Sequence, residues 1–468
     1  MYGQKRRILC LPLLTACLFA VQSGAQARDL SLADAVDMAL AANTGLRITR
    51  QGEHTADAAL KQARGRNGVS VSASDSVRWS KTNGETQQSS NGLNLSASLP
   101  LYTGGANQAS IQSGEIGAAA ARLTTERARE DLKYEVIAAY YNAVEALKKT
   151  EVQREAVGNY DAHLGNVTAL YEAGAQARID VLRSSVELSN ARQELISAEN
   201  AYEVNLATLR NLLNMDRGEE LHLTTDVSYV PFEKTVQDCI SYAYGNRHDL
   251  QVQKDTLAQR ELAVDIAKAG KKPTVNLTVG SGITRQFRPH NDTNRDVSAS
   301  VGVNWNIFDS GVTRAQIDAA EAERDTALLN VRRTEETIDL DLRKAYLNLR
   351  EAEKRFTATG DAVKQAEEDY FIASQRYRAG EGILLDVLDA QLALSKAKQN
   401  DINARYDYAR YRAQVENLMG EPLTAAERAA ADGLPKVTQA ERDSADAANL
   451  ATSAAVQMTV AKNEVPGK

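Results

Sequence analysis

The sequence has few aromatic, proline and cysteine residues, and it has no excess of positive charge. Aromatic residues make up 5% of the 468 residues, and there are 8 prolines and 3 cysteines. A chain that is instead rich in Ala, Glu, Gln, Arg and Leu is typical of long helices and coiled coils rather than of several compact domains. The formal net charge of −7 leaves no basic footprint for nucleic acid, so we expect no nucleic-acid partner.

The sequence also lacks the residue groupings of enzymes and metal sites. The five histidines are scattered, without a His-x-x-x-His spacing, and no Gly-x-Ser-x-Gly motif is present. Cys10 and Cys17 lie in an N-terminal segment that we expect to be removed, which leaves Cys239 without an intrachain partner. We therefore expect no catalytic residues, no metal, no cofactor and no disulfide.

The N-terminus has the features of a secretory signal. Three basic residues at 5–7 precede a mostly apolar stretch at 8–21, and Ala25-Gln26-Ala27 offers a cleavage site. The apolar stretch is shorter than the roughly 20 residues that a transmembrane helix needs. We interpret residues 1–27 as a cleaved signal peptide. Lipoprotein processing at Cys17 is an alternative, but it would place apolar residues directly after the lipidated cysteine.

The mature chain is internally duplicated. Residues 140–146 (YYNAVEA) reappear as residues 346–352 (YLNLREA), a shift of 346 − 140 = 206 that holds without a gap along both halves. Chance similarity between alanine-rich helices would drift in register. The predicted organisation is a signal peptide (1–27), a first repeat (28–215), a linker (216–233), a second repeat (234–422) and a C-terminal tail that its composition predicts to be disordered (423–468).

Each repeat contains helices too long for a globular domain. Residues 31–65 and 235–270 each predict an amphipathic helix, which a strand pair follows. Residues 105–170 and 311–376 then contain no proline, and a helix of about 66 residues is about 100 Å long. Apolar residues at spacings of three and four predict a coiled-coil seam. Glycine-containing breaks and a second long helix follow in each repeat, which predicts two antiparallel helical hairpins.

Four short segments alternate between apolar and small polar residues, as strands with one lipid-facing side do. They lie near residues 69–79, 93–101, 275–283 and 297–305. Each is about 10 residues long, which matches the 9–11 that a tilted transmembrane strand needs. Asp75 interrupts the apolar face without an evident reason. Alternation alone leaves open a soluble sandwich with one wet face.

A membrane barrel from these strands requires more than one chain. No apolar run after residue 27 approaches the length of a transmembrane helix, so a membrane crossing has to use a closed barrel. Bacterial barrels have at least eight strands. Three copies would supply 3 × 4 = 12 strands.

The order of these parts, occurring twice, resembles the TolC family from about residue 30 to residue 422. The similarity is carried by the strand-to-helix junctions at 99–105 (LPLYTGG) and 305–311 (WNIFDSG), and by Tyr-x-x-Gly turns followed by Asp-Val-Leu. The resemblance implies a membrane α+β fold, in which a homotrimer forms a 12-stranded transmembrane β-barrel, four strands per chain, continuous with a periplasmic α-helical barrel.

The resemblance also implies a function and its partners. Members of the family are outer-membrane ducts that extend into the periplasm and contact outer-membrane lipid. They dock on a periplasmic adaptor (membrane fusion) protein and an inner-membrane transporter of the ABC or RND type, and they pass protein or small-molecule cargo to the exterior. A trimeric outer-membrane-anchored coiled-coil adhesin is the alternative, although an adhesin would not need two gap-free repeats.

Finally, the resemblance implies a gate at the end far from the strands. The matching positions of an acidic constriction are Asp386 and Asp389, and Tyr377 matches the turn tyrosine. The two aspartates share a helical face, so a trimer would gather six carboxylates around its axis. Alternatively, such aspartates merely favour a helix N-terminus. An arginine that holds the tip of TolC shut is replaced here by glycine. The other expected site residues are those of the tip turns (Gly174, Asp180, Gly380, Gly382) and of the membrane interfaces (Trp79, Tyr102, Trp305, Phe308).

Overall fold

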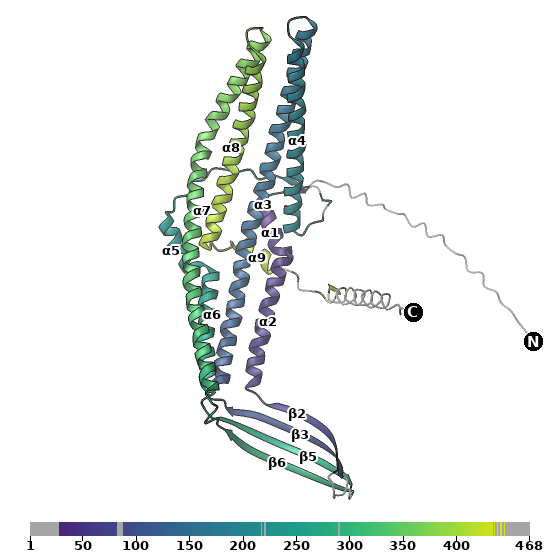
Figure 1. Cartoon of the computed structure of the whole chain (residues 1–468), viewed down its shortest axis with the longest axis vertical. Helices are drawn as coiled ribbons and strands as arrows, with labels where there is room; N and C mark the ends of the chain where they lie inside the picture. Colours follow the sequence, from purple (N-terminus) through teal and green to yellow (C-terminus); the bar gives the residue numbers. More distant parts are fainter. Residues whose placement is uncertain are drawn as a thin grey trace, which may run out of the picture.

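The protein is an elongated bundle of helices with a curved β-sheet at one end (Figure 1). The computed structural model describes residues 28–81, 88–216, 218–219, 221–288, 291–433, 435, 438, 440–441 and 444. The predicted signal peptide and most of the C-terminal tail therefore lie outside the described residues. No helix in the described part of the chain is both long and apolar enough to cross a membrane.

Two long helical hairpins form the body of the molecule and confirm the predicted hairpins. The first consists of α3 (Ala106–Glu172) and α4 (Arg178–Leu212), and the second consists of α7 (Val312–Arg378) and α8 (Leu384–Met419). Helices α3 and α7 have 67 residues each, so each is about 100 Å long. Both begin after a glycine in the left-handed region, with φ of 98° at Gly105 and 91° at Gly311. The duplication in sequence is therefore a duplication in structure.

The helix predicted to precede each strand pair is in fact two helices. The first repeat has α1 (Leu32–Ala42) and α2 (Thr44–Arg66), and the second has α5 (Val236–Asn246) and α6 (His248–Ala269). Asn43 is extended and its side chain accepts from the N–H of Leu46, while its Nδ2 donates to the Leu212 carbonyl at 3.0 Å. Asn43 therefore ends α1 and caps α2. Arg247 is likewise extended between α5 and α6, but without a side-chain cap, and the prediction of single helices was wrong in both repeats.

Part of the predicted disordered tail is helical. Helix α9 (Ala425–Asp432) begins with a capping box between Thr424 and Glu427, and it packs against α1. Its Ala431 is fully buried, and Glu427 pairs with Lys133 of α3 at 2.9 Å. The Thr-x-x-Glu spacing is visible in the sequence, so the prediction of disorder was wrong here because composition outweighed a capping signal.

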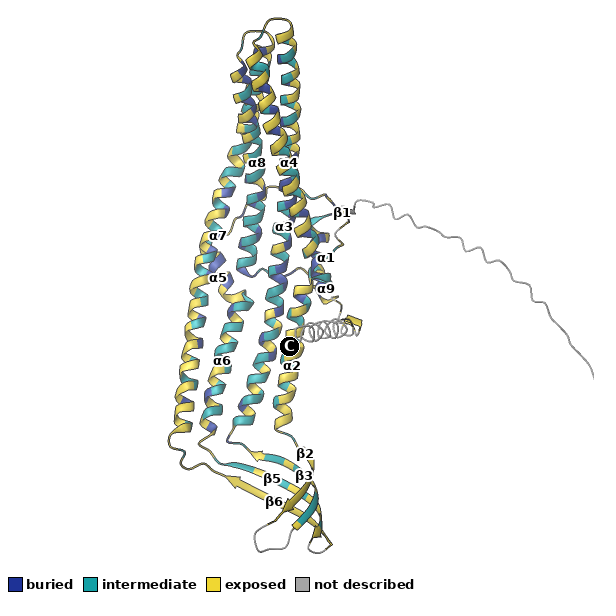
Figure 2. Ribbon diagram, turned by 45° about the vertical axis from the view of Figure 1, so that its right-hand side comes forward, coloured by how far each residue is buried: buried dark blue, intermediate teal, exposed yellow. Residues whose placement is uncertain are grey.

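The strands form one antiparallel sheet in the order β2-β3-β5-β6 within the described residues. They are β2 (Ser70–Ser80), β3 (Gln88–Tyr102), β5 (Thr274–Arg288) and β6 (Asp292–Asn304). Directly opposed residues share a face, and the register aligns the apolar positions of all four strands on one side. Every residue of β2 and β6 is exposed (Figure 2). No other described part of the chain covers the apolar face.

A second, parallel pair joins β1 (Arg28–Leu30) to β4 (Leu221–Leu223) beside the middle of the hairpins. The fully buried Tyr140 of α3 holds this region together. Its hydroxyl donates to the Leu30 carbonyl at 2.9 Å and accepts from the N–H of Thr225 at 2.9 Å. Two hydrophobic cores lie at this level; one is formed by the second repeat, and the other is formed mainly by the first repeat with Tyr406 of α8 and Ala431 of α9.

Candidate functional site at the hairpin tips

The two hairpin turns have the same local geometry. Gly174 and Gly380 follow the ends of α3 and α7 with φ of 74° and 76°, a left-handed conformation that favours glycine. In both turns the next N–H donates back to the last helical turn, from Ala175 to Leu170 at 2.8 Å and from Glu381 to Arg376 at 2.9 Å. These are Schellman-type ends. The sequence prediction of two equivalent tip turns agrees with this geometry.

Gly382 occupies a position where the turn leaves little room for a side chain. A Cβ atom there would lie 3.0 Å from the backbone nitrogen of Tyr377 and 3.2 Å from the carbonyl carbon of Arg376. Both neighbours are backbone atoms, so the turn would have to shift to accept any other residue. An arginine clasp at this position does not fit the conformation of this tip.

Asp386 and Asp389 are exposed on one face of α8, as their spacing predicts. They line a groove of ≈ 410 Å³ together with Asp369 and Arg376 of α7. The face therefore carries three carboxylates and one guanidinium. Sequence reasoning missed Asp369 and Arg376, because they belong to the other helix of the hairpin and no spacing rule connects them to α8.

Tyr377 lies between the hairpins rather than on an exposed surface. It is 2% exposed and packs in a small core with Val167 of α3 and Val387 of α8. Its ring centroid is 5.1 Å from that of His163 of α3. In this structure Tyr377 joins α7 to α3. That it belongs to a constriction stays a prediction.

Burial shifts the pKa of both rings at this contact. Desolvation raises the pKa of Tyr377, and the nearby carboxylate of Asp180 raises it further. Desolvation lowers the pKa of His163, and the positive charge of Arg378 adds to that effect. Both side chains are therefore held neutral. The Tyr377 hydroxyl and the Nε2 atom of His163 have no hydrogen-bond partner among the described residues.

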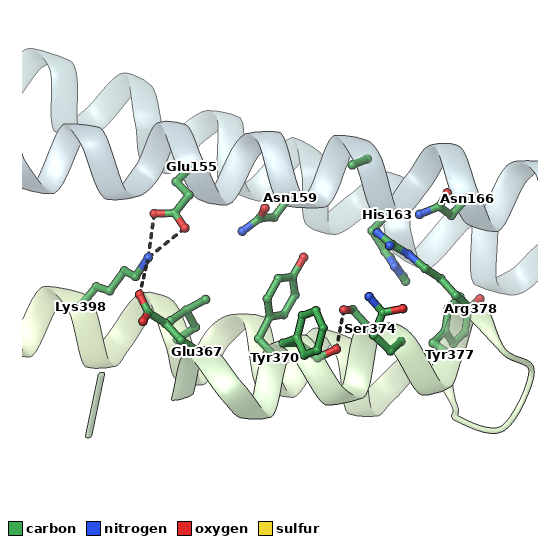
Figure 3. Close-up of a pocket in the computed structure, with 14 residues that line it drawn as sticks. Glu155, Asn159, His163, Asn166, Glu367, Tyr370, Ser374, Tyr377, Arg378 and Lys398 are labelled. Carbon is green, nitrogen blue, oxygen red and sulfur yellow. Dashed lines mark hydrogen bonds and ion pairs between the residues drawn. The ribbon is translucent and has the colours of Figure 1, made fainter. Parts of the chain in front are cut away.

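An ion-pair network joins the hairpins about two to three helical turns from this contact, as Figure 3 shows. The Lys398 ammonium of α8 lies 2.9 Å from a carboxylate oxygen of Glu155 in α3 and 3.3 Å from one of Glu367 in α7. Burial lowers the pKa of Lys398, but its hydrogen bonds to the two carboxylates outweigh burial and the net pKa is raised. The amide of Asn159 donates to Oε1 of the buried Gln391 at 3.0 Å. Sequence reasoning did not identify these residues.

A cavity of ≈ 400 Å³ lies between these two sets of contacts, and Figure 3 draws the residues that line it. Asn159 and His163 face it from α3, and Tyr370 and Arg378 face it from α7. Between α3 and α7 the cavity therefore separates the contact of Tyr377 with His163 from the ion pairs of Lys398. Among the described residues, no three His, Cys, Asp or Glu side chains come together in a metal-binding arrangement.

The four predicted interface aromatics lie at the two ends of the sheet. Trp79 is near the end of β2 far from the helices, whereas Tyr102 ends β3 at the helical side. Trp305 and Phe308 follow β6 on the helical side, and the Trp305 indole donates to the Lys271 carbonyl at 3.0 Å. Trp79 and Phe308 are 64% and 84% exposed. Both ends of the apolar face therefore carry exposed aromatic rings.

Comparison with known proteins identifies the family. The family model described as outer membrane efflux protein matches residues 33–215 and 239–421. Protein CyaE of Bordetella pertussis is 27% identical, over 80% of this chain and 80% of its own length. Outer membrane protein TolC of Escherichia coli is 22% identical, over 64% of this chain and 63% of its own length.

A solved structure shows the same fold. The Campylobacter jejuni CmeC outer membrane channel superposes with a TM-score of 0.74 at 19% identity, over 86% of this chain and 90% of its own. The expected likeness to TolC is thereby confirmed, as is the expectation that the chain is not an enzyme, because the family consists of channel proteins. The chain belongs to the outer membrane efflux protein family and is an outer-membrane channel protein of an export system that extends into the periplasm.

Proposed function

We propose that three copies of this chain form one duct, in which a 12-stranded transmembrane barrel continues into a periplasmic barrel of α-helices. The observation that carries this proposal is the open sheet of four strands. Its edge strands β2 and β6 have no further strand partner among the described residues, and its apolar face is uncovered. Unpaired edges are not stable in a membrane, and bacterial barrels have at least eight strands. Three sheets supply 3 × 4 = 12 strands.

The length of the helices supports a periplasmic role for the other end. Helices α3 and α7 carry the tips about 100 Å from the sheet. At that distance the tips can meet a periplasmic adaptor (membrane fusion) protein and, through it, an inner-membrane transporter of the ABC or RND type. The duct then passes protein or small-molecule cargo to the exterior without chemistry of its own.

The exposed face of α8 supports a gate at the tip. Asp386 and Asp389 of three copies place six carboxylates around one axis. These carboxylates attract cations, and they repel one another as the tip closes. Arg376 lines the same groove and partly offsets this charge. In place of an arginine clasp at position 382, closure uses the contacts between the hairpins: Tyr377 with His163, Gln391 with Asn159, and Lys398 with Glu155.

Planar-bilayer conductance of the purified trimer tests both parts of the proposal. We expect cation-selective current that multivalent cations block from the periplasmic side. The double variant Asp386→Asn/Asp389→Asn should lose most of this selectivity and block, because the six carboxylates are removed. Asp180→Asn is the matched control, since Asp180 is in the first turn of α4 and is the repeat equivalent of Asp386. Absence of current would refute the duct, whereas unchanged selectivity in the double variant would refute the gate alone.

A further inference from the structure

The apolar face of the sheet carries two arginines at its free end. The register pairs Leu93 of β3 with Ile283 of β5, and Ile283 with Arg295 of β6. One step further along, Arg285 of β5 is opposite Thr293. Opposed residues share a face, so Arg285 and Arg295 are diagonal neighbours on the same side as Leu93 and Ile283. Diagonal neighbours lie about 7–8 Å apart at Cα, which allows two long side chains to converge on one group.

These arginines are surrounded by exposed apolar and aromatic side chains. Ile283 is 43% exposed and Phe287 is 48% exposed, and Val297, which follows Arg295 on the same face, is 82% exposed. The Arg285 guanidinium lies over the Phe287 ring at 5.5 Å from its centroid. Cations at the border of an apolar surface direct their charged ends to the adjacent polar layer.

Their height matches the polar layer of the outer leaflet. From Val275 at the helical end to Arg285, β5 rises about 33 Å along the strand, or about 25 Å across the membrane at a typical tilt. An outward-facing apolar band is about 25 Å tall. Since the helices extend into the periplasm, the free end of the sheet is the outer one. Both guanidinium groups are therefore at the level of the lipid headgroups.

Within the described part of the chain, no carboxylate neutralises these arginines. The Nε atom of Arg285 donates its only hydrogen bond to Oδ1 of the Asn291 side chain, at 3.4 Å. Asp292 and Asp296 are opposite Gln286 and Gly282, which places them on the other face of the sheet. Asp75 shares the face, but within one chain it is three strands away from Arg295, and it accepts a hydrogen bond from Asn91 at 3.0 Å.

We propose that Arg285 and Arg295 bind the phosphate of a lipid headgroup in the outer leaflet. Guanidinium groups bind phosphate bidentately, and two of them on a lipid-facing surface match a phosphorylated lipid in charge and position. The proposal rests on the barrel of the proposed function, because that barrel turns this face to lipid. It concerns the membrane part only and requires nothing of the gate.

Native mass spectrometry of the purified trimer tests the site, with bisphosphorylated lipid A and the same lipid without phosphates as probes. Each arginine near a lipid surface contributes about fivefold in affinity, so the wild type should prefer the phosphorylated lipid by about 25-fold. Arg285→Gln/Arg295→Gln should bind both lipids alike. Arg78→Gln is the matched control, because Arg78 pairs with Ser90 at the same height on the opposite face, and it should keep the preference.

The outcomes separate the site from the duct. Equal binding of both lipids by the wild type, or an equal loss in Arg78→Gln, would overturn the proposed site. Arg285→Lys/Arg295→Lys keeps the charge but not the bidentate geometry, so this variant should show an intermediate preference for the phosphorylated lipid. It replaces the glutamine variant in the test if that variant does not assemble. The variants should conduct ions as the wild type does. A wild-type trimer without conductance would instead refute the proposed function.

Discussion

Replacing Lys398 by methionine removes the ion pairs that connect α8 to Glu155 of the other hairpin, while it keeps most of the aliphatic side chain. The lysine side chain is 19% exposed, and the side chains of Glu155 and Glu367 are 49% and 51% exposed. The two carboxylates can therefore be solvated by water once the ammonium is lost. The substitution removes a tie between the hairpins without leaving a buried unpaired charge.

The size of the effect follows from this exposure. Partly exposed ion pairs contribute about 0.5–1 kcal/mol each after solvent screening. If the three protomers of the proposed duct open together, the closed tip should lose about 1.5–3 kcal/mol, and the ratio of open to closed channels should rise roughly 10- to 150-fold. Single-channel recording in planar bilayers measures this ratio directly as open probability.

Two comparisons test the reasoning. Lys364→Met is the control, because Lys364 pairs with Asp361 on its own helix and both side chains are about 80% exposed, at 78% and 81%. It should leave the open probability unchanged. In a Glu155→Gln/Glu367→Gln background, Lys398→Met should have no further effect. Equal open probabilities for Lys398→Met and Lys364→Met would refute a closing role for this network.

Two further expectations concern protonation of the tip and the C-terminal helix. The lowered pKa of His163 means that its contact with Tyr377 favours the neutral ring, so the proposed closure is weakened as the pH falls through the ordinary histidine pKa of about 6.5. Open probability should rise from about pH 7.5 to about pH 5.5, and His163→Phe should abolish that rise but keep the packing against Tyr377. A pH response that persists in His163→Phe would assign it to other groups. Thr424→Ala removes the N-cap of α9 at a cost of about 1 kcal/mol, so amide exchange in Ala425–Asp432 should become faster than in the wild type while exchange in α3 stays unchanged.

The sequence was sufficient for elements that depend on local patterns. The apolar residues of helices and strands recur with short periods that are visible in the sequence. The 206-residue shift allowed the prediction for each repeat to be checked against the other. Asp386 and Asp389 were predicted because a family motif and a helical spacing agree on them, and the structure places both on one exposed face of α8. The breaks at Asn43 and Arg247 were missed because a single residue with an extended backbone interrupts an otherwise continuous apolar pattern.

Contacts between distant segments were not predictable in this way. Glu155 and Lys398 are 243 residues apart, and no rule of spacing connects them. The burial of Tyr377 depends on His163 of the other repeat in the same way. Asp75, which had no explanation in the sequence, is stabilised by Asn91 of the neighbouring strand, and only the register reveals this pair. The sequence pattern therefore predicts the helices and strands, whereas the contacts between them depend on how the folded chain places them.

The pairing of β3 with β5 determines when the sheet can form during secretion. Leu95 and Ser281 are opposed although they are 281 − 95 = 186 residues apart, so the first strand pair has to wait until most of the chain has been translocated. A lone two-stranded ribbon is marginally stable in water, and one with an apolar face is prone to aggregation. The first repeat is therefore translocated with a two-stranded ribbon whose apolar face is exposed and whose partner strand β5 is still missing. Its long helices, whose contacts are local, can fold early and keep that ribbon apart from its neighbours until the second repeat arrives.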